Sequence, residues 1–250
     1  MEVIIFFIAH WYLSLFTQSF FHHRYSAHRQ FTMNKFWEEV FHTLSYIFQG
    51  ASYLSPRTYG IMHRQHHAYA DTEKDVHSPK FDDNLFKMMW KTKKVYNNMN
   101  TMEDTIEDKW KKNLPGTGKL EKLAESRLVR LMWIIAYTVF YYIYVPSDML
   151  YLWALLPINF VMGPFHGVII NWFAHKVGYR NYKVSDTSTN LWPWDLIMWG
   201  EGLHNNHHKF GASASFAQKW WEFDPMIIPI NIMHTLGIIK KSRDGKSRAY

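Results

Sequence analysis

The sequence predicts an all-α integral membrane protein in which about three transmembrane helices and an interfacial amphipathic helix carry a cytosolic helical cap with a histidine-ligated dimetal site. Three observations lead to this fold class: two long windows without basic residues, a helical hydrophobic pattern between them, and histidines gathered in tight groups. The chain has 250 residues, so we expect one membrane domain over residues 1–240 and a basic, disordered tail over residues 241–250. With 48% hydrophobic residues, a wholly disordered chain is excluded.

Two charge-poor windows indicate the membrane-spanning part. The first, Val3–Phe21, has no formally charged side chain over 19 residues, close to the roughly 20 that a helix needs to cross a bilayer. The second, Leu131–Ile170, contains one acidic residue and is interrupted at Val145–Asp148, where a proline favours a turn. This window predicts a helical hairpin with the arms Leu131–Val145 and Met149–Ile170.

The distribution of charge predicts the orientation of these segments. All 28 Lys and Arg residues lie outside the two windows, so the positive-inside rule places the basic segments in the cytosol and the N-terminus outside. Three crossings satisfy this arrangement. Residues 1–23 have neither the basic start nor the cleavage site of a signal peptide, and we expect them to remain attached. The alternative, a soluble helical protein with a buried hairpin, does not account for the charge asymmetry.

The remaining segments are more polar. Asn34–Ser55 has apolar residues at helical spacing together with Glu38 and Glu39, which predicts an amphipathic helix in the membrane interface or the core. Residues 81–128 predict surface helices around a loop at Asn113–Gly118.

The histidines form the strongest motif. The chain has no cysteine, so any metal must be held by nitrogen and oxygen ligands. Positions i, i+3 and i+4 share one helix face, so each HxxHH sequence should direct three imidazoles the same way. So many nitrogens exceed the needs of one ion, and two metals are the natural number. Eight of the fifteen histidines fall in three groups: His23 and His28; His63, His66 and His67; His204, His207 and His208.

Two features of this set stay open at this point. His23 and His28 are five residues apart, about 140° around an α-helix, so a helix end or two different metals must be involved. The sequence alone therefore does not assign each ligand to one metal or the other. An even number of crossings between the groups places all three at the cytosolic face, and Asn171 and His175, at the cytosolic end of the last span, join them. We treat the other histidines as packing or loop residues: His10, His22, His42, His77, His166 and His234.

These residues resemble the membrane fatty acid desaturases, in particular the acyl-CoA (Δ9-type) branch. The resemblance covers roughly residues 5–240 and is most specific at Asn171-x3-His175 and at Gly200–His208 (GEGLHNNHH). It implies a diiron centre, cycling between Fe2+ and Fe3+, and no catalytic side chain beyond the metal ligands. The implied ligands are His23, His28, His63, His66, His67, Asn171, His175, His204, His207 and His208.

The resemblance also implies a function: O2-dependent desaturation of a long-chain fatty acyl thioester, acyl-CoA at Δ9, to a cis double bond. Electrons would come from a separate ferredoxin or cytochrome b5-type donor, because no haem-binding segment is visible. Two departures stand out. The first span of the family is absent, and Tyr59–Met62 replaces the Trp and the Arg-Asp pair found before the second histidine group in eukaryotic members. We therefore expect a bacterial inner-membrane enzyme with its metal site at the cytoplasmic face.

Substrate contacts and alternatives complete the sequence-based expectations. Candidate substrate contacts are Gln49, Trp172, Trp192 and Trp194. The main alternative is a membrane diiron alkyl, sterol or carotenoid hydroxylase with the same histidine groups. A metal transporter would place its histidines near mid-membrane. The net charge of +7 fits an anionic acyl-CoA or an acidic donor, and in the absence of a recognisable motif we expect no nucleic-acid partner.

Overall fold

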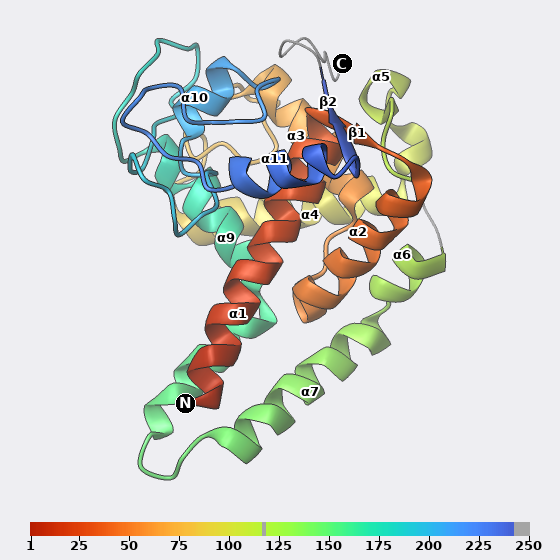
Figure 1. The fold of residues 1–250 in the computed structure, drawn as a ribbon, viewed down its shortest axis with the longest axis vertical. Helices are drawn as coiled ribbons and strands as arrows, with labels where there is room; N and C mark the ends of the chain where they lie inside the picture. Colours follow the sequence, from red (N-terminus) through yellow and green to blue (C-terminus); the bar gives the residue numbers. More distant parts are fainter. Residues whose placement is uncertain (117–118, 243–250) are drawn as a thin grey trace.

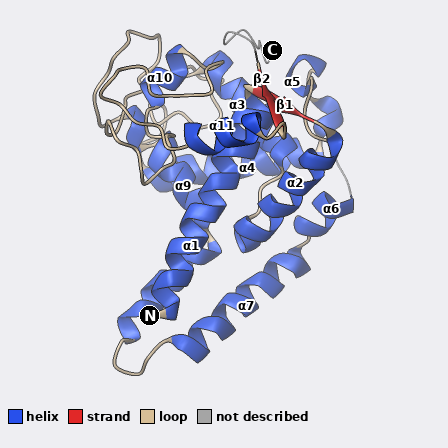
Figure 2. Ribbon diagram, viewed as in Figure 1, coloured by secondary structure: helices blue, strands red, loops and turns tan. Residues whose placement is uncertain are grey.

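The computed structural model describes residues 1–116 and 119–242 and is mostly helical, with one two-stranded sheet in that part of the chain. Helices project downward from a broader cap in Figure 1, and Figure 2 shows that loops are concentrated in the cap. The tail expected over residues 241–250 lies outside the described residues from 243 onward, and so do residues 117–118 of the expected loop.

The first predicted span is longer than expected. Helix α1, Glu2–Thr17, continues directly into a π-helix, η1, over Gln18–Ala27. By length and composition this 26-residue unit can cross a membrane. A second span is possible if the bent pair Leu150–Phe160 and Met162–His175 counts as one. One or two spans are thus supported, where the sequence predicts about three.

The predicted hairpin forms, but only its first arm is a continuous helix. Helix α7, Arg127–Tyr144, matches the first arm. The second arm is divided into η4 (Leu150–Leu155), α8 (Leu156–Phe160), α9 (Met162–Asn171) and η5 (Phe173–His175), and it bends by 77° between α8 and α9. The bend lies at Val161, whose backbone is not helical. The second arm, expected as one helix over Met149–Ile170, is therefore present as a bent series of shorter helices.

The amphipathic helix is present as α2, Lys35–Gln49. The Asn34 side chain caps its start by accepting a hydrogen bond from the Trp37 amide at 3.0 Å, and Gly50 ends it with a φ of +51°. Its buried face includes Phe41, which packs against Phe20 of η1. Helix α2 therefore lies against the upper part of the first span, as its hydrophobic pattern indicates.

The cap holds the remaining elements. The predicted surface helices over residues 81–128 are present, and the two strands pair antiparallel from Phe31 with Lys241 to Met33 with Ile239. Their bounds are: β1, Phe31–Met33; η2, Gly50–Ser52; α3, Pro56–Tyr69; α4, Leu85–Thr101; η3, Glu103–Thr105; α5, Asp108–Lys111; α6, Lys119–Ala124; α10, His204–Lys209; α11, Ile227–Thr235; β2, Ile239–Lys241.

Two apolar clusters position the cap on the spans. One packs Phe20 and Phe31 against Ile230 and Ile239 and so joins η1 and the sheet to α11. The other packs Val3 against Tyr141 and joins α1 to α7 and α8 at the far end. Because η1 is held from several sides, the histidines that it carries are fixed within the cap.

Candidate metal centre

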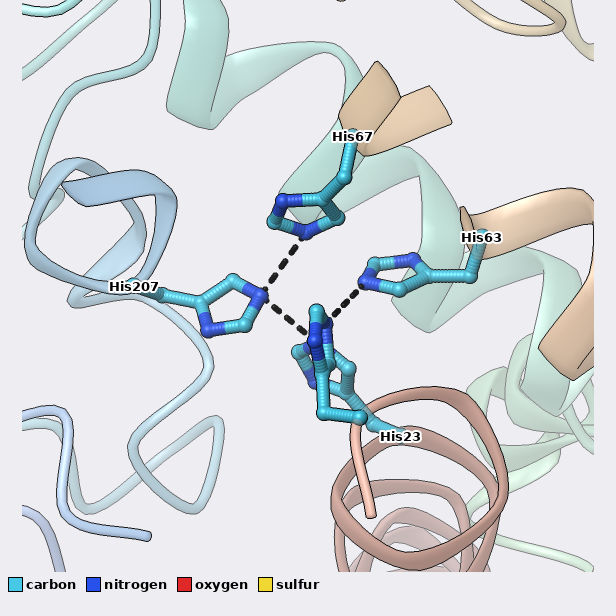
Figure 3. A group of neighbouring side chains, drawn as sticks. His23, His63, His67 and His207 are labelled. Carbon is cyan, nitrogen blue, oxygen red and sulfur yellow. Dashed lines mark hydrogen bonds between the residues drawn. The ribbon is translucent and has the colours of Figure 1, made fainter. Parts of the chain in front are cut away.

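The structure brings nine histidines into two adjoining groups; eight come from η1, α3, η5 and α10, and His28 directly follows η1. Figure 3 shows the rings of His23, His63, His67 and His207 directed toward a common centre. We call the groups cluster one and cluster two. Cluster one contains His23, His28, His63, His67 and His207, and cluster two contains His66, His175, His204 and His208. Within each cluster the ligand atoms lie within 4.8 Å of one another.

The π-helix explains how His23 and His28 reach the same cluster. In a π-helix the backbone N–H of residue i+5 bonds to the carbonyl of residue i, so residues five apart stand one above the other. The His28 amide donates to the His23 carbonyl at 3.1 Å, and the two ring centroids are 4.9 Å apart. The 140° separation expected for an α-helix does not apply here.

Each HxxHH sequence serves both clusters. On α3, His63 and His67 belong to cluster one and His66 to cluster two. On α10, His204 and His208 belong to cluster two, whereas His207 belongs to cluster one. The expectation that the three imidazoles of one HxxHH point the same way is therefore wrong, because the i+3 side chain diverges enough to face the other centre.

Close nitrogen pairs define the interior of the clusters. His207 Nε2 lies 2.9 Å from Nε2 of both His23 and His67. In cluster two, Nε2 of His175 lies 3.1 Å from Nε2 of His204. The Nε2 atoms therefore converge from different elements onto two small volumes.

Buried carboxylates hold the opposite ring nitrogen of several histidines. Nδ1 of His66 donates to Asp75 at 2.9 Å, and Nδ1 of His208 donates to Asp186 at 2.9 Å. Burial of Asp75 acts to raise its pKa, but His66, His77 and the hydrogen bond from the Asp71 amide together hold the pKa below its usual value. Such contacts fix the ring orientation and leave the Nε2 lone pair for a metal.

Cluster one has its own carboxylate in Glu201, which accepts a hydrogen bond from Nδ1 of His23. Burial acts to raise the pKa of Glu201, but His23, Arg24 and the Ser19 hydroxyl together hold the pKa below its usual value. Arg24 is fully buried and also bonds Asp224 at 2.9 Å. A charged network therefore connects cluster one to the segment that leads into α11.

The sequence patterns did not predict the carboxylates that bond the clustered histidines, although Glu201 lies only three residues before His204. His77, expected to be a loop residue, does lie in a loop, but it is buried there with its ring 4.3 Å from that of His66. Neither of its ring nitrogens meets a hydrogen-bond partner among the described residues. The available signal was the Asp75-x-His77 sequence shortly after the first HxxHH, at His63–His67.

The donor set fits bound transition-metal ions. Nε2 of His66 and Nε2 of His208 are buried and meet no hydrogen-bond partner within residues 1–116 and 119–242. Burial lowers the pKa of His208 to about 4 and holds that of His63 well below its usual range, so both rings are neutral near pH 7. Converging lone pairs on neutral imidazoles are the ligand set that iron and related metals take.

A cavity of about 1240 Å³ opens beside the clusters and is lined at one side by His23, His63 and His204. Apolar side chains such as Met62 make up much of its wall. The lining also includes three cations with no ion pair among the described residues: Lys93, Arg127 and Arg130. The cavity therefore combines an apolar interior, a histidine-lined side and basic groups, and it suits a long amphiphile with an anionic head.

The predicted substrate contacts lie elsewhere. Gln49 is buried near His22 at 3.3 Å, Trp172 stacks under Lys176, Trp192 bonds Asp195, and Trp194 is 65% exposed. None of the four lines the cavity. Their assignment as substrate contacts remains a prediction that the cavity does not support. Asn171, in contrast, ends α9 and lines the same cavity as His204.

The other histidines make ordinary packing contacts. His42 bonds the Tyr53 hydroxyl at 2.7 Å, His166 faces Gln18 at 3.1 Å, and His234 lies 3.2 Å from the Ile239 carbonyl. His22 lies 2.9 Å from the Leu54 carbonyl, and His10 lies 3.5 Å from the Tyr137 hydroxyl.

Fold and site together define a mostly helical protein with two buried histidine clusters that are suited to bind metal. The model of the fatty acid desaturase family matches residues 2–225. The chain therefore belongs to the fatty acid desaturase family, and its enzyme class is that of an oxidoreductase.

Individual relatives agree with this assignment. The chain is 30% identical over 227 residues to the Delta-9 desaturase-like 5 protein of Arabidopsis thaliana, covering 88% of this chain and 70% of the relative. It is 27% identical over 223 residues to the acyl-CoA C20 Delta5-desaturase of Anemone leveillei, covering 86% and 65%. Over a shorter stretch of 70 residues it is 41% identical to the sn-1 stearoyl-lipid 9-desaturase of Anabaena variabilis, which covers 28% of this chain and 26% of the relative. The chain thus spans roughly two thirds of the two plant relatives.

Proposed function

We propose that this protein desaturates a long-chain fatty acyl group in an O2-dependent reaction at a histidine-ligated diiron centre, forming a cis double bond. The proposed substrate is an acyl thioester, acyl-CoA with insertion at Δ9. One observation carries the proposal: two clusters of buried imidazoles adjoin a large cavity with apolar walls, which His23, His63 and His204 line at one side. Names of relatives that act on acyl-CoA and at Δ9 support the substrate and the position.

The chain's residues have separate roles in this proposal. The nine clustered histidines, with Asn171 at the cavity wall, would hold the two irons. Bound iron would supply the O2 activation that removal of hydrogen from unactivated CH2 groups requires, since side chains cannot provide it. Glu201, Asp75 and Asp186 orient the imidazoles through Nδ1. The burial of the clusters excludes bulk water from the reacting carbons.

The cavity positions the substrate. Each CH2 group that leaves water for an apolar wall contributes about 0.8 kcal/mol, so a long acyl chain gains much of its affinity there. Lys93, Arg127 and Arg130 offer positive charge to the phosphates of the CoA group. Because the cavity fixes the chain relative to the histidines, its depth selects the carbons that lose hydrogen.

The proposed membrane arrangement has three crossings: Glu2–Ala27, α7, and the bent pair from Leu150 to His175. The first and third have the required length and apolar composition, and the charge-poor sequence of α7 after Arg130 supports the second. We place the metal centre at the cytoplasmic face of a bacterial inner membrane, because the basic segments surround the histidines. Electrons would come from a separate ferredoxin or cytochrome b5-type protein.

The test is the fatty-acid profile of a desaturase-deficient host that expresses the chain together with a ferredoxin and its reductase. Double-bond positions are located by mass spectrometry, and the matched control is His204→Ala. We expect monoenes with one dominant position that are missing from the control. Hydroxylated products would replace this proposal with the hydroxylase alternative, and an iron-loaded protein without any product would refute it.

A further inference from the structure

One surface of the cap carries exposed cations and aromatic side chains directly outside cluster two. We call it the basic face and define it by Arg180, Lys183, Lys209, Lys219, Tyr182 and Trp220. The most exposed large apolar side chain in the described residues belongs to it, since Trp220 is 95% exposed. The four cations form no ion pair with any described residue.

The surrounding segment does not neutralise this charge. Between residues 176 and 222 the acidic residues are Asp186, Asp195, Glu201 and Glu222, and all four are buried; Glu222 accepts a hydrogen bond from the Lys219 amide at 3.0 Å. Lys176 adds a further exposed cation to the same segment. The basic face is therefore a region of uncompensated positive charge, which attracts anionic partners and accelerates their association.

Hydrogen bonds and ring contacts hold the face together. The amides of Asn181 and Tyr182 both donate to the Asn205 side chain of α10, at 3.0 and 2.9 Å. The Tyr182 ring packs edge to face on Phe210 at 5.0 Å, and Lys219 Nζ lies 5.0 Å from the Tyr182 ring centroid. Two segments far apart in the sequence thus present one ordered surface.

A short series of hydrogen bonds joins the basic face to the metal centre. Arg180 donates to the backbone carbonyl of Asp186 at 2.7 Å, and the Asp186 carboxylate accepts from Nδ1 of His208 at 2.9 Å. His208 belongs to cluster two. A redox protein seated on the face would therefore come close to the clusters without occupying the cavity, whose lining includes none of the basic-face residues.

The position in the fold favours a soluble partner over the bilayer. Figure 1 shows α10 and its neighbouring loops at the upper left, whereas the N-terminus of α1 and the end of α7 lie at the opposite end of the molecule. The face also carries an exposed Trp, a half-buried Tyr and an exposed Arg, which are the residue types that dominate protein–protein binding energy.

We propose that the basic face is the docking site of an acidic, one-electron redox protein. This inference rests on the proposed function and names the partner of that site. In each turnover the acyl chain loses two hydrogens with two electrons, the donor supplies two more electrons in two one-electron steps, and two protons are taken up. One O2 accepts the four electrons and leaves as two waters.

The experiment measures binding of a reduced and an oxidised acidic [2Fe–2S] ferredoxin to the iron-loaded protein in nanodiscs of zwitterionic lipid. The test variant is K183E/K209E/K219E, and Arg180 is kept because it contacts the loop that holds His208. The matched control is K112E/K122E/K240E, which changes the charge equally at exposed positions of other elements. A basic cytochrome c serves as the charge control for the probe. Iron content and melting temperature identify any variant that has lost its fold.

We expect the test variant to raise the ferredoxin Kd at least about tenfold at low salt and the control variant to change it less than about twofold. The wild-type Kd should rise by a similar factor between about 20 and about 200 mM NaCl. Trp220→Ala should raise the ferredoxin Kd about tenfold or more at both salt concentrations, because the contact of an exposed aromatic side chain is not screened by salt.

Three results would overturn the docking site: an equal loss of ferredoxin affinity in both triple variants, a ferredoxin Kd that does not depend on salt, or tight binding of the basic cytochrome c. If the test variant lost affinity for phosphatidylglycerol vesicles and kept its ferredoxin Kd, the face would bind membrane instead. A chain that binds ferredoxin through this face and forms no unsaturated product would refute the proposed function alone. A chain that forms product and binds ferredoxin equally well after the triple reversal would refute the docking site alone.

Discussion

Replacement of Asp75 by Asn tests whether the two clusters are separate metal sites. The Asp75 carboxylate is fully buried and accepts the Nδ1–H of His66 at 2.9 Å, and His66 belongs to cluster two. Asn keeps the shape and one acceptor oxygen, but it removes the negative charge that makes the imidazole a stronger donor to a metal. Loss of such a partner usually weakens metal binding 10- to 100-fold, about 1.4 to 2.7 kcal/mol.

The division of ligands makes the expected result specific. Within residues 1–116 and 119–242, the hydrogen bonds of the Asp75 carboxylate go to His66 and to the amides of Asp71 and His77, whereas His23 of cluster one bonds a different carboxylate, Glu201. D75N should therefore lose affinity at one site and keep it at the other, so that bound iron falls from two ions per chain toward one at limiting iron. The assay is a titration with Fe2+ followed by elemental analysis of the desalted protein.

The matched control is Asp83→Asn, which removes a carboxylate of the same length from an exposed pair with Lys87. This variant should bind iron as the wild type does, because surface ion pairs contribute little. Equal weakening of both iron sites in D75N, or two full sites at limiting iron, would contradict the division into two clusters.

Three further predictions concern stability. Chelation of the metals should lower the melting temperature by several degrees and iron should restore it, because ligands that bind only the folded state stabilise it by mass action; a chelator without effect would argue against bound metal. Gly50→Ala should destabilise the protein by more than about 1 kcal/mol in denaturant titration, because φ is +51° and the new Cβ would lie 1.8 Å from the Tyr137 hydroxyl; unchanged stability would contradict this packing. Burial raises the pKa of Asp195 to about 6 from 3.8, so the stability it contributes is present at low pH and is lost as the pH rises from about 4 through about 6. D195N should remove about 3 kcal/mol of this pH dependence, measured as the difference between the two melting profiles; parallel profiles would refute the shift.

Sequence periodicity predicted the helices whose signal is local. Helix α2 follows from its Asn34 cap, its amphipathic face and the glycine that ends it, and α7 follows from an apolar run that ends at a proline turn. The bend in the second arm of the hairpin was not predicted, because an apolar composition does not indicate where a helix changes direction. The 77° change of direction between α8 and α9 takes place within a segment that reads as continuously apolar.

The four polar and aromatic residues proposed as substrate contacts show the same limit. Gln49, Trp172, Trp192 and Trp194 are near histidines or spans in the sequence, but cavity walls are assembled from elements far apart in the chain. Residues of α4, such as Met89, and of α7, such as Arg130, line the cavity without any local signal that would indicate it.

The sequence by itself determined the chemistry of the site: histidines at helical spacing and no cysteine, so that nitrogen and oxygen are the available metal ligands. The spacing of histidines along one helix can be recognised in the sequence, because it involves only residues within one or two helical turns of each other. Only the tertiary structure decided which imidazole serves which cluster. The π-helix turns His28 onto His23, and the docking of α3 against α10 divides each HxxHH between two centres. The carboxylates that orient the rings and the cavity beside them likewise arise from packing between distant segments, which no local pattern specifies.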